Sequence, residues 1–213
     1  MGTKERRAGE KQARLDQILA GARQMLFSHG IDNISISGIA KKAELGVGTI
    51  YFYFQSKEEI FAALQEEGLS LLYRNIQQIH SRPVTSDRKL TLIGQAFYTF
   101  CHDHKDYYDV INYFLSSSKI FFGPDLKNQI DMSGAKILDL IEKIIEQGMA
   151  ERTFAPTDAR KYAVHFFGAL HGVMHLKKLE NTALAKEDHR QIYAFSLAQL
   201  VAGLKGGNLC SQI

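Results

Sequence analysis

The chain has 213 residues, of which 45% are hydrophobic and 23% are charged, and its formal net charge is +3. This composition is typical of a folded protein of one or two domains, and it excludes disordered, collagen-like and fibrous chains. Two widely separated cysteines, Cys101 and Cys210, exclude a disulfide framework and a CxxC motif, so a reducing cytoplasm is expected. No uncharged run reaches the ~18 residues of a membrane span, and the charged N-terminus lacks the apolar core of a signal peptide.

The positive charge is concentrated at the N-terminal end of the chain. Residues 1–57 contain nine Lys or Arg against five Asp or Glu, whereas residues 58–213 contain seventeen against eighteen. Such an excess suits a small module that approaches phosphate groups, although it is also common on an ordinary solvated face.

Helical periodicity dominates the first third of the sequence. Apolar side chains spaced by three and four positions predict an amphipathic helix over 15–26, with Gly30 as its C-cap glycine. Two short segments follow, at 35–43 and 47–54, separated by a three-residue turn. A long helix is then expected to begin at a capping box and to continue to about residue 80.

That capping box is the sequence Ser56-Lys57-Glu58-Glu59. The Ser56 hydroxyl is expected to accept a hydrogen bond from the Glu59 amide, and the Glu59 carboxylate to accept one from the Ser56 N–H. After a break at 82–87, further helices are predicted at 87–104, 106–119, 125–150, 158–180 and 188–205. No stretch alternates with period two for long enough to form a strand, so the expected fold is all-α.

Residues 35–54 have the layout of a helix-turn-helix. The second helix is expected to present four side chains to a partner: Val47, Thr49, Phe52 and Tyr53. It is expected to pack three side chains against its neighbours: Ile50, Tyr51 and Phe54. Thr49, Tyr53 and Lys57, spaced by four, are predicted to share one face and to offer polar groups to phosphates. The same corner occurs in any three-helix bundle, so the pattern alone leaves DNA binding open.

The segment over residues 14–64 resembles the DNA-binding region of the tetracycline-repressor (TetR/AcrR) family. The resemblance is carried by Ser35, Ile39-Ala40, Gly48-Thr49-Ile50-Tyr51, Tyr53-Phe54 and Ser56-Lys57-Glu58. It implies an all-α fold, with an N-terminal three-helix bundle that holds the helix-turn-helix and a larger helical domain for ligand binding and dimerisation. The implied boundaries are 1–57 for the DNA-binding domain, 58–205 for the larger domain and 206–213 for a frayed tail.

The resemblance also implies which residues meet DNA. Ser35 would cap the first motif helix and face a phosphate, Gly48 would allow close approach, and Thr49 would contact phosphate or base. The other implied contacts are Val47, Tyr51, Tyr53, Lys57 and a basic arm made of Lys4, Arg6 and Arg7. The alternative for Tyr51 is core packing, and the alternative for Lys57 is a solvated position at a helix start.

Three residues in and after the turn depart from the family pattern. Glu44 stands where a glycine is usual, and at a positive φ it would cost about 1 kcal/mol while presenting a negative charge to DNA. Gly46 replaces a serine-like cap, which glycine tolerates. Val47 replaces a polar base reader, and a thymine methyl is its natural contact.

The C-terminal part of the chain is rich in aromatic residues, with ten Phe and seven Tyr after residue 57. The family resemblance implies a small-molecule pocket there, suited to an apolar or aromatic effector with one polar end. The candidate ligand contacts are Phe97, Phe100, Tyr108, Phe114, Phe121, His171 and His175. For each of these aromatic residues, ordinary core packing is the alternative.

The last two predicted helices carry too much apolar surface for a single hidden face. The first contains Gly168 and Gly172, four positions apart, and the second contains the stripe of Ala194 and Ala198 beside Val201. By resemblance, these residues would form half of a four-helix bundle between two subunits. The alternative is a helical hairpin buried within one subunit.

Together these features predict a cytoplasmic homodimer that binds a palindromic double-stranded DNA operator, usually as a repressor, and releases it when a small molecule binds. Ligand binding would tilt the helix over 56–80 and so move the recognition helices apart. No catalytic constellation is visible, so no enzyme activity, cofactor, resident metal or membrane partner is expected. The alternative is a metal-responsive regulator that uses His171 and His175, which are spaced by four.

Overall fold

In a computed structural model of the chain, the described residues are 3–29, 33–116, 124–184 and 188–206. Within these ranges the chain forms α-helices and one short 3-10 helix and contains no strand, which confirms the all-α prediction. Every helix in the same ranges is too short or too polar to span a lipid bilayer. Gly30 and Phe121 lie outside the described residues, as do the side chains of Lys4 and Phe27.

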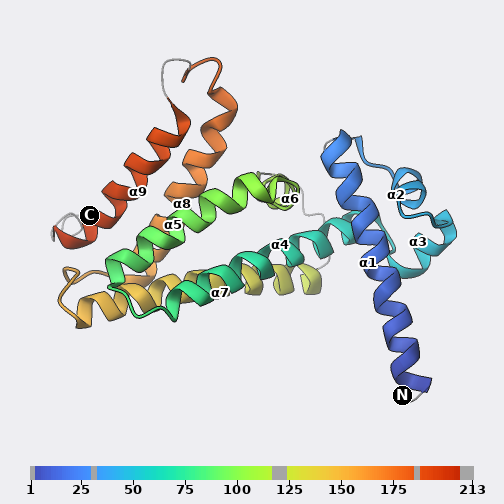
Figure 1. Cartoon of the computed structure of the whole chain (residues 1–213), viewed down its shortest axis with the longest axis horizontal. Coiled ribbons are helices and arrows are strands. Elements are labelled where there is room, and N and C mark those ends of the chain that lie inside the picture. The colour runs from blue at the N-terminus through green and yellow to red at the C-terminus, as the bar shows by residue number, and fades with distance from the viewer. Residues whose placement is uncertain (1–2, 30–32, 117–123, 185–187, 207–213) are drawn as a thin grey trace. The chain divides into compact units, whose positions relative to one another are not determined.

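Figure 1 shows the helices labelled in chain order. Their bounds are α1 Thr3–His29, α2 Ile36–Lys42, α3 Val47–Tyr53, α4 Lys57–His80, α5 Ser86–Asp103, α6 Lys105–Ser116, α7 Pro124–Ala150, α8 Ala159–His175, η2 Leu176–Leu179 and α9 His189–Lys205. The single helix predicted over 158–180 is therefore divided, because the chain tightens into the 3-10 helix η2 after His175.

The chain divides into two compact units that do not coincide with the expected domains. The first unit comprises residues 1–69 and 104–131, and the second comprises 70–103 and 132–213. Helix α6 belongs to the first unit because it packs against α1, although it lies far beyond residue 57 in sequence. The functional boundary at residue 57 stays a prediction.

The core of the first unit joins α1, α2, α3, the start of α4 and α6. Its most deeply buried side chains come from all five helices and include Ile18, Ile39, Ile50, Ile60 and Val110. Helices α1 and α2 approach closely at Gly21, where a Cβ atom would lie 2.9 Å from the Ala43 nitrogen. This packing fixes the short helices α2 and α3, which are too short to be stable alone.

The second unit has its own core, in which α5, α8 and α9 pack together. Phe100 and Phe166 are almost fully buried, as is Tyr193, whose hydroxyl donates to the Gly94 carbonyl at 2.7 Å. Gly94 also lies against the Leu197 side chain, so α5 and α9 meet without room for a larger residue.

Candidate nucleic-acid interface and effector region

The first helix of the motif begins at a well-formed cap. Ser35 has extended backbone angles, and its hydroxyl accepts a hydrogen bond from the Gly38 N–H at 3.1 Å. This hydroxyl satisfies one of the amide groups that a helix start leaves unpaired. The predicted capping role of Ser35 is thus confirmed, while its contact with a phosphate stays a prediction.

The turn between α2 and α3 places Glu44 in the left-handed region, with φ of 54°. The N–H groups of Glu44 and Leu45 donate to the Lys41 and Ala40 carbonyls, so the backbone at the end of α2 is satisfied. A side chain at this φ is strained by about 1 kcal/mol or more. The conformational strain predicted for Glu44 is present in the structure.

Helix α3 starts after Gly46, which provides no side-chain cap. Ile50 is fully buried and Phe54 nearly so, and these two side chains attach α3 to the core of the first unit. The helix ends at Tyr53, because Phe54 is already extended. Lys57 consequently lies at the start of a separate helix, and the prediction that it shares a helical face with Thr49 and Tyr53 was wrong.

The outward face of α3 is more apolar than the sequence pattern predicted. Val47 is 42% exposed, Tyr51 is 54% exposed and Phe52 is 81% exposed, whereas Tyr53 is half-buried against the core. The predicted packing of Tyr51 and presentation of Tyr53 were therefore wrong. With about 100° of rotation per residue and Ile50 pointing inward, Tyr53 returns toward the core while Tyr51 and Phe52 point away.

The capping box at the start of α4 is formed, but the Glu59 carboxylate has a different hydrogen-bond partner from the predicted one. The Ser56 hydroxyl accepts from the Glu59 N–H at 3.2 Å, as predicted. The Glu59 carboxylate accepts from the Gln55 N–H at 2.7 Å rather than from Ser56. Beside this cap, the Lys57 ammonium donates to the Ile34 carbonyl at 3.3 Å and lies 5.7 Å from the centre of the Phe61 ring.

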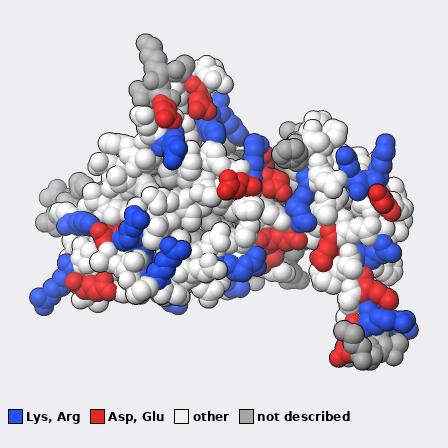
Figure 2. All heavy atoms as spheres, in the orientation of Figure 1, with Lys and Arg blue, Asp and Glu red and all other residues white. Residues whose placement is uncertain are grey.

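The basic side chains of the first unit are spread over several helices. Arg6 and Arg7 are exposed on α1, and Arg6 pairs with Glu10 at 3.4 Å. Lys41 and Lys42 are exposed in the last turn of α2, next to the turn that leads into α3. The sequence prediction omitted these two lysines, although they stand beside the motif turn. On the face shown in Figure 2, basic and acidic side chains interleave and form no continuous basic patch.

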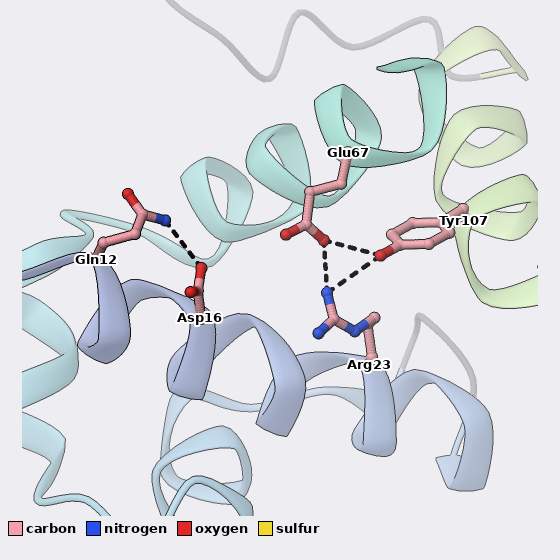
Figure 3. A network of polar contacts seen from close by, with 5 residues as sticks. All are labelled: Gln12, Asp16, Arg23, Glu67 and Tyr107. Atoms are coloured by element: carbon pink, nitrogen blue, oxygen red, sulfur yellow. Dashed lines mark hydrogen bonds and ion pairs between the residues drawn. The ribbon is translucent and has the colours of Figure 1, made fainter. Parts of the chain in front are cut away.

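A half-buried polar network joins α1, α4 and α6 within the first unit (Figure 3). The Arg23 guanidinium lies 2.5 Å from the Glu67 carboxylate, and the Tyr107 hydroxyl donates to the same carboxylate at 2.9 Å. Arg23 also donates to the Tyr107 oxygen at 3.1 Å. Burial and the Glu67 carboxylate raise the pKa of Tyr107 to about 12, so its hydroxyl keeps the proton that it donates.

Close packing surrounds this network. A Cβ atom at Gly68 would lie 2.8 Å from the Tyr107 Cβ, so α4 and α6 approach at the residue next to Glu67. On the side of α1, a shallow cavity of about 450 Å³ is lined by Arg23, Gln24, Ser28, Lys42 and Asp106. The network and the glycine contact attach α6 to the same unit as the helix-turn-helix.

Residues 18–64 match the family model for bacterial regulatory proteins of the tetR family. This N-terminal segment therefore belongs to the DNA-binding region of that family. The fatty acid metabolism regulator protein of Bacillus subtilis is 30% identical over 96 residues, which are 45% of this chain and 50% of that protein. The matched region thus spans half the length of this relative.

Solved structures share the fold over most of the chain. The transcriptional regulator FadR from Bacillus subtilis in complex with stearoyl-CoA has a TM-score of 0.73, with 22% identity, 88% of this chain and 97% of that chain covered. AibR in complex with isovaleryl coenzyme A and operator DNA has a TM-score of 0.68, with 18% identity and coverage of 88% and 98%. At identities of 22% and 18%, these comparisons show a shared fold, which covers 88% of this chain and so includes parts of both compact units.

The predicted effector contacts are divided between the two units. In the second unit, Phe97 and Phe100 are buried, and the Phe97 ring lies 5.0 Å from the Phe167 ring and 6.2 Å from the His171 ring, centre to centre. Tyr108 and Phe114 belong to the first unit, where the Phe114 ring lies 6.3 Å from the Phe61 ring. The structure therefore groups Phe97 with His171, whereas Tyr108 and Phe114 lie in the other unit.

His171 and His175 occupy successive turns near the end of α8. Burial, and secondarily the charge of His175, holds the pKa of His171 below its usual value, which favours the neutral ring. Among the residues that the structure describes, no group of three or more His, Cys, Asp or Glu is arranged to hold a metal ion. The described structure thus offers no support for the metal-responsive alternative.

The residues predicted for the subunit interface lie on α8 and α9, which pack against each other in the second unit. The Tyr162 hydroxyl joins the pair by donating to the Leu200 carbonyl at 2.6 Å. Four of the predicted residues are exposed: Gly168, Gly172, Ala194 and Ala198. Val201 is instead buried within its own unit. Phe195 is 65% exposed beside the two alanines.

Proposed function

We propose that the chain is a ligand-responsive transcriptional regulator that binds a palindromic DNA operator as a homodimer in the cytoplasm and acts as a repressor. The observation that carries this proposal is the helix-turn-helix itself, with its capped first helix, its strained turn at Glu44 and its outward-facing second helix. Its residues are those that match the tetR family model. The second helix of such a motif enters the major groove of duplex DNA.

The DNA-facing set would comprise α3 together with the groups that surround it. Val47, Gly48, Thr49 and Tyr51 lie on α3, while Ser35 and Lys57 stand at the starts of α2 and α4. Ser35 and Lys57 would hold phosphates, and the exposed basic side chains of α1, Arg6 and Arg7, would follow the backbone of the duplex. Tyr53 would support the DNA-facing side chains rather than contact DNA itself, because its ring is packed against the core.

A dimer would supply the second recognition helix. The exposed stripe of small residues on α8 and α9 allows the backbones of two more helices to approach, as in a four-helix bundle between subunits. A two-fold arrangement would place the two copies of α3 about 34–36 Å apart, which is one turn of the duplex. This spacing explains the proposed palindromic operator.

We propose an acyl-CoA thioester as the effector. Two proteins of similar fold were solved with stearoyl-CoA and with isovaleryl coenzyme A, the second also with operator DNA. In this chain, the aromatic side chains of the second unit, among them Phe97, Phe100 and Phe167, would receive the acyl group. Helix α4 begins in the first unit and ends in the second, so a ligand that tilts it would move α3. Repression would be relieved if the ligand favours the displaced arrangement by a few kcal/mol.

Removing the Lys57 charge tests the DNA-binding part of the proposal. Lys57→Met retains an apolar stem over the Phe61 ring but loses the ammonium. We expect weaker binding to every duplex and a salt dependence that is flatter by about one unit, measured by fluorescence anisotropy across a salt series. Lys178→Met, at an exposed lysine of η2, is the matched control and should bind as the wild type does. An unchanged salt slope in Lys57→Met would show that this lysine holds no phosphate.

The effector part has a separate test. Stearoyl-CoA should raise the midpoint of thermal unfolding and release bound DNA, whereas free coenzyme A should do neither at the same concentration. Stearate should have a weaker effect than the thioester. If coenzyme A alone released DNA, the aromatic side chains would not be the acyl site.

A further inference from the structure

Helix α3 combines two properties that bear on how it would meet DNA. Its sequence, Val47-Gly-Thr-Ile-Tyr-Phe-Tyr53, contains no charged residue and no amide side chain. Three of its side chains are nevertheless large, apolar and exposed, and Phe52 is the most exposed large hydrophobic residue in the described chain. Leaving apolar area in water is unfavourable by about 25 cal/mol per Å², so such a face is expected to have an apolar partner.

The exposed side chains form one continuous face. Val47 and Tyr51 are four positions apart, as are Gly48 and Phe52, so the two pairs lie side by side along the helix. A Cβ atom at Gly48 would meet no described atom within 4 Å, which leaves open space one turn before the Phe52 ring. We call the set of Val47, Gly48, Tyr51 and Phe52 the aromatic face of α3.

The Phe52 ring is also oriented by a neighbour. It makes an edge contact with the Tyr53 ring, with 5.1 Å between centres and 80° between planes. Tyr53 in turn packs against the core of the first unit. The Tyr53 ring therefore restricts the rotamers of the exposed Phe52 side chain. Phe52 then loses less conformational entropy on binding a partner than an unsupported side chain would.

These properties determine what the face can read in a major groove. Guanine and adenine are distinguished by paired hydrogen bonds from Arg, Lys, Asn or Gln, and α3 has none of these. The apolar feature of the groove is the 5-methyl group of thymine. We propose that the aromatic face of α3 recognises thymine methyl groups, with Phe52 as the main specificity-determining residue. The inference rests on the proposed DNA-binding function and assigns its base specificity.

The charges around the face agree with this division of roles. Lys41 and Lys42 are exposed at the end of α2, and Lys57 stands at the start of α4, so cations flank α3 without lying on it. Contacts to phosphates position a protein on DNA but carry no sequence information. Affinity would then come from the flanking lysines, and sequence preference from the apolar side chains of α3.

Deoxyuridine provides a probe of this inference, because it lacks only the methyl group of thymidine. Duplexes that bind the 213-residue chain are first selected from a random library. The enriched duplex is then synthesised with uracil in place of single thymines. We expect a loss of about fourfold in affinity for each contacted methyl group. Phe52→Ala should bind the thymine duplex about tenfold more weakly and should no longer distinguish it from the uracil duplex.

Two further variants keep the result decisive. Leu115→Ala, at another exposed apolar residue of the first unit, should retain both the wild-type affinity and the fourfold preference. If Phe52→Ala binds too weakly to measure, Phe52→Leu should bind measurably with a reduced methyl preference. Circular dichroism and unfolding curves establish that each variant is folded.

The outcomes separate this inference from the function on which it rests. If no duplex is enriched at low salt, the DNA-binding proposal fails. If a duplex is enriched but wild type and Phe52→Ala respond equally to uracil, DNA binding stands and the thymine inference is overturned. If Phe52→Ala binds the enriched duplex as tightly as wild type, the aromatic face belongs to another partner, such as a protein, and the inference is again overturned.

Discussion

The two compact units differ in the kind of apolar surface that they leave exposed. In the first unit, large rings project from one seven-residue helix, and Phe52 is the extreme case. In the second unit, the exposed stripe on α8 and α9 consists mainly of glycine and alanine, with Phe195 beside it. Both faces are apolar, but the first consists mainly of large projecting side chains and the second mainly of small ones.

This difference indicates two different partners. Small residues let helix backbones approach to the 8–10 Å typical of packed helices, so the stripe suits two more helices. Projecting rings instead fit into a groove whose walls lie to either side. Apolar exposure alone would not distinguish these roles, whereas the size and spacing of the exposed side chains do.

The largest expected effect comes from placing a charge on the second face. Phe195→Glu should convert the dimer to a monomer, because a carboxylate buried between subunits would be unpaired. The apparent affinity for a palindromic duplex should fall by about a hundredfold or more, since the two half-sites are no longer bound together. Sedimentation equilibrium measures the mass, and fluorescence anisotropy measures the affinity.

The matched control for this variant is Leu179→Glu, at an exposed apolar residue of η2 in the same unit. It should remain dimeric and bind DNA normally. A dimeric Phe195→Glu protein would contradict the assignment of the α8–α9 stripe to the subunit interface.

A second comparison uses the two non-glycine residues that the described structure holds at positive φ. Glu44 has a φ of 54° in the first unit, and Arg152 has a φ of 57° in the second. Replacing either with glycine should raise the free energy of unfolding by about 1 kcal/mol or less, because relieved strain is partly offset by greater freedom of the unfolded chain. Urea unfolding measures both changes.

DNA affinity should separate these two variants. Glu44→Gly removes a negative charge from the turn that leads into α3, so binding should tighten. Arg152→Gly should leave DNA affinity unchanged, because Arg152 follows α7 in the second unit. Equal DNA affinities for the two variants would show that Glu44 does not face the duplex.

The layout of the helix-turn-helix could be predicted from local sequence patterns, and the family resemblance added the Ser35 cap and the strained turn at Glu44. The Ser35 cap, the strained turn at Glu44 and the start of α3 each depend on residues within a few positions of one another. The errors on α3 have a different origin. Tyr51 and Tyr53 were exchanged between the inner and outer faces, because a seven-residue helix without charged side chains has too little periodicity to define its orientation.

Contacts between distant parts of the chain could not be predicted. Arg23 and Glu67 are 44 positions apart, and Arg23 and Tyr107 are 84 apart. No sequence spacing indicates that these side chains meet, so α6 was assigned with the C-terminal domain. The predicted effector residues were placed in one pocket for the same reason, because aromatic composition does not reveal which rings share a core.

The Arg23–Glu67–Tyr107 network allows a smaller test of the first unit. Tyr107→Phe keeps the ring against Gly68 but removes the hydroxyl that donates to Glu67. We expect a loss of about 1 kcal/mol in the free energy of unfolding, the usual net contribution of one such hydrogen bond. Tyr51→Phe is the control within the same unit, since the exposed hydroxyl of Tyr51 is open to water. Equal effects of the two variants in urea unfolding would show that the network adds no stability.

The smallest expected effect concerns acid sensitivity and the second unit. His171 and His80 both belong to that unit, and in both the pKa lies below the usual histidine value, first because of burial. Below about pH 6.5 the unfolded chain therefore takes up protons that the folded chain resists, and the free energy of unfolding decreases as the pH falls.

Urea unfolding at pH 7.5 and pH 5.5 measures this decrease. His171→Gln should show a smaller decrease than wild type, with His80 retaining its part of the effect. His29→Gln, at an exposed histidine of the first unit, should decrease as wild type does. If His171→Gln lost stability as steeply as wild type, His171 would not contribute to the acid sensitivity.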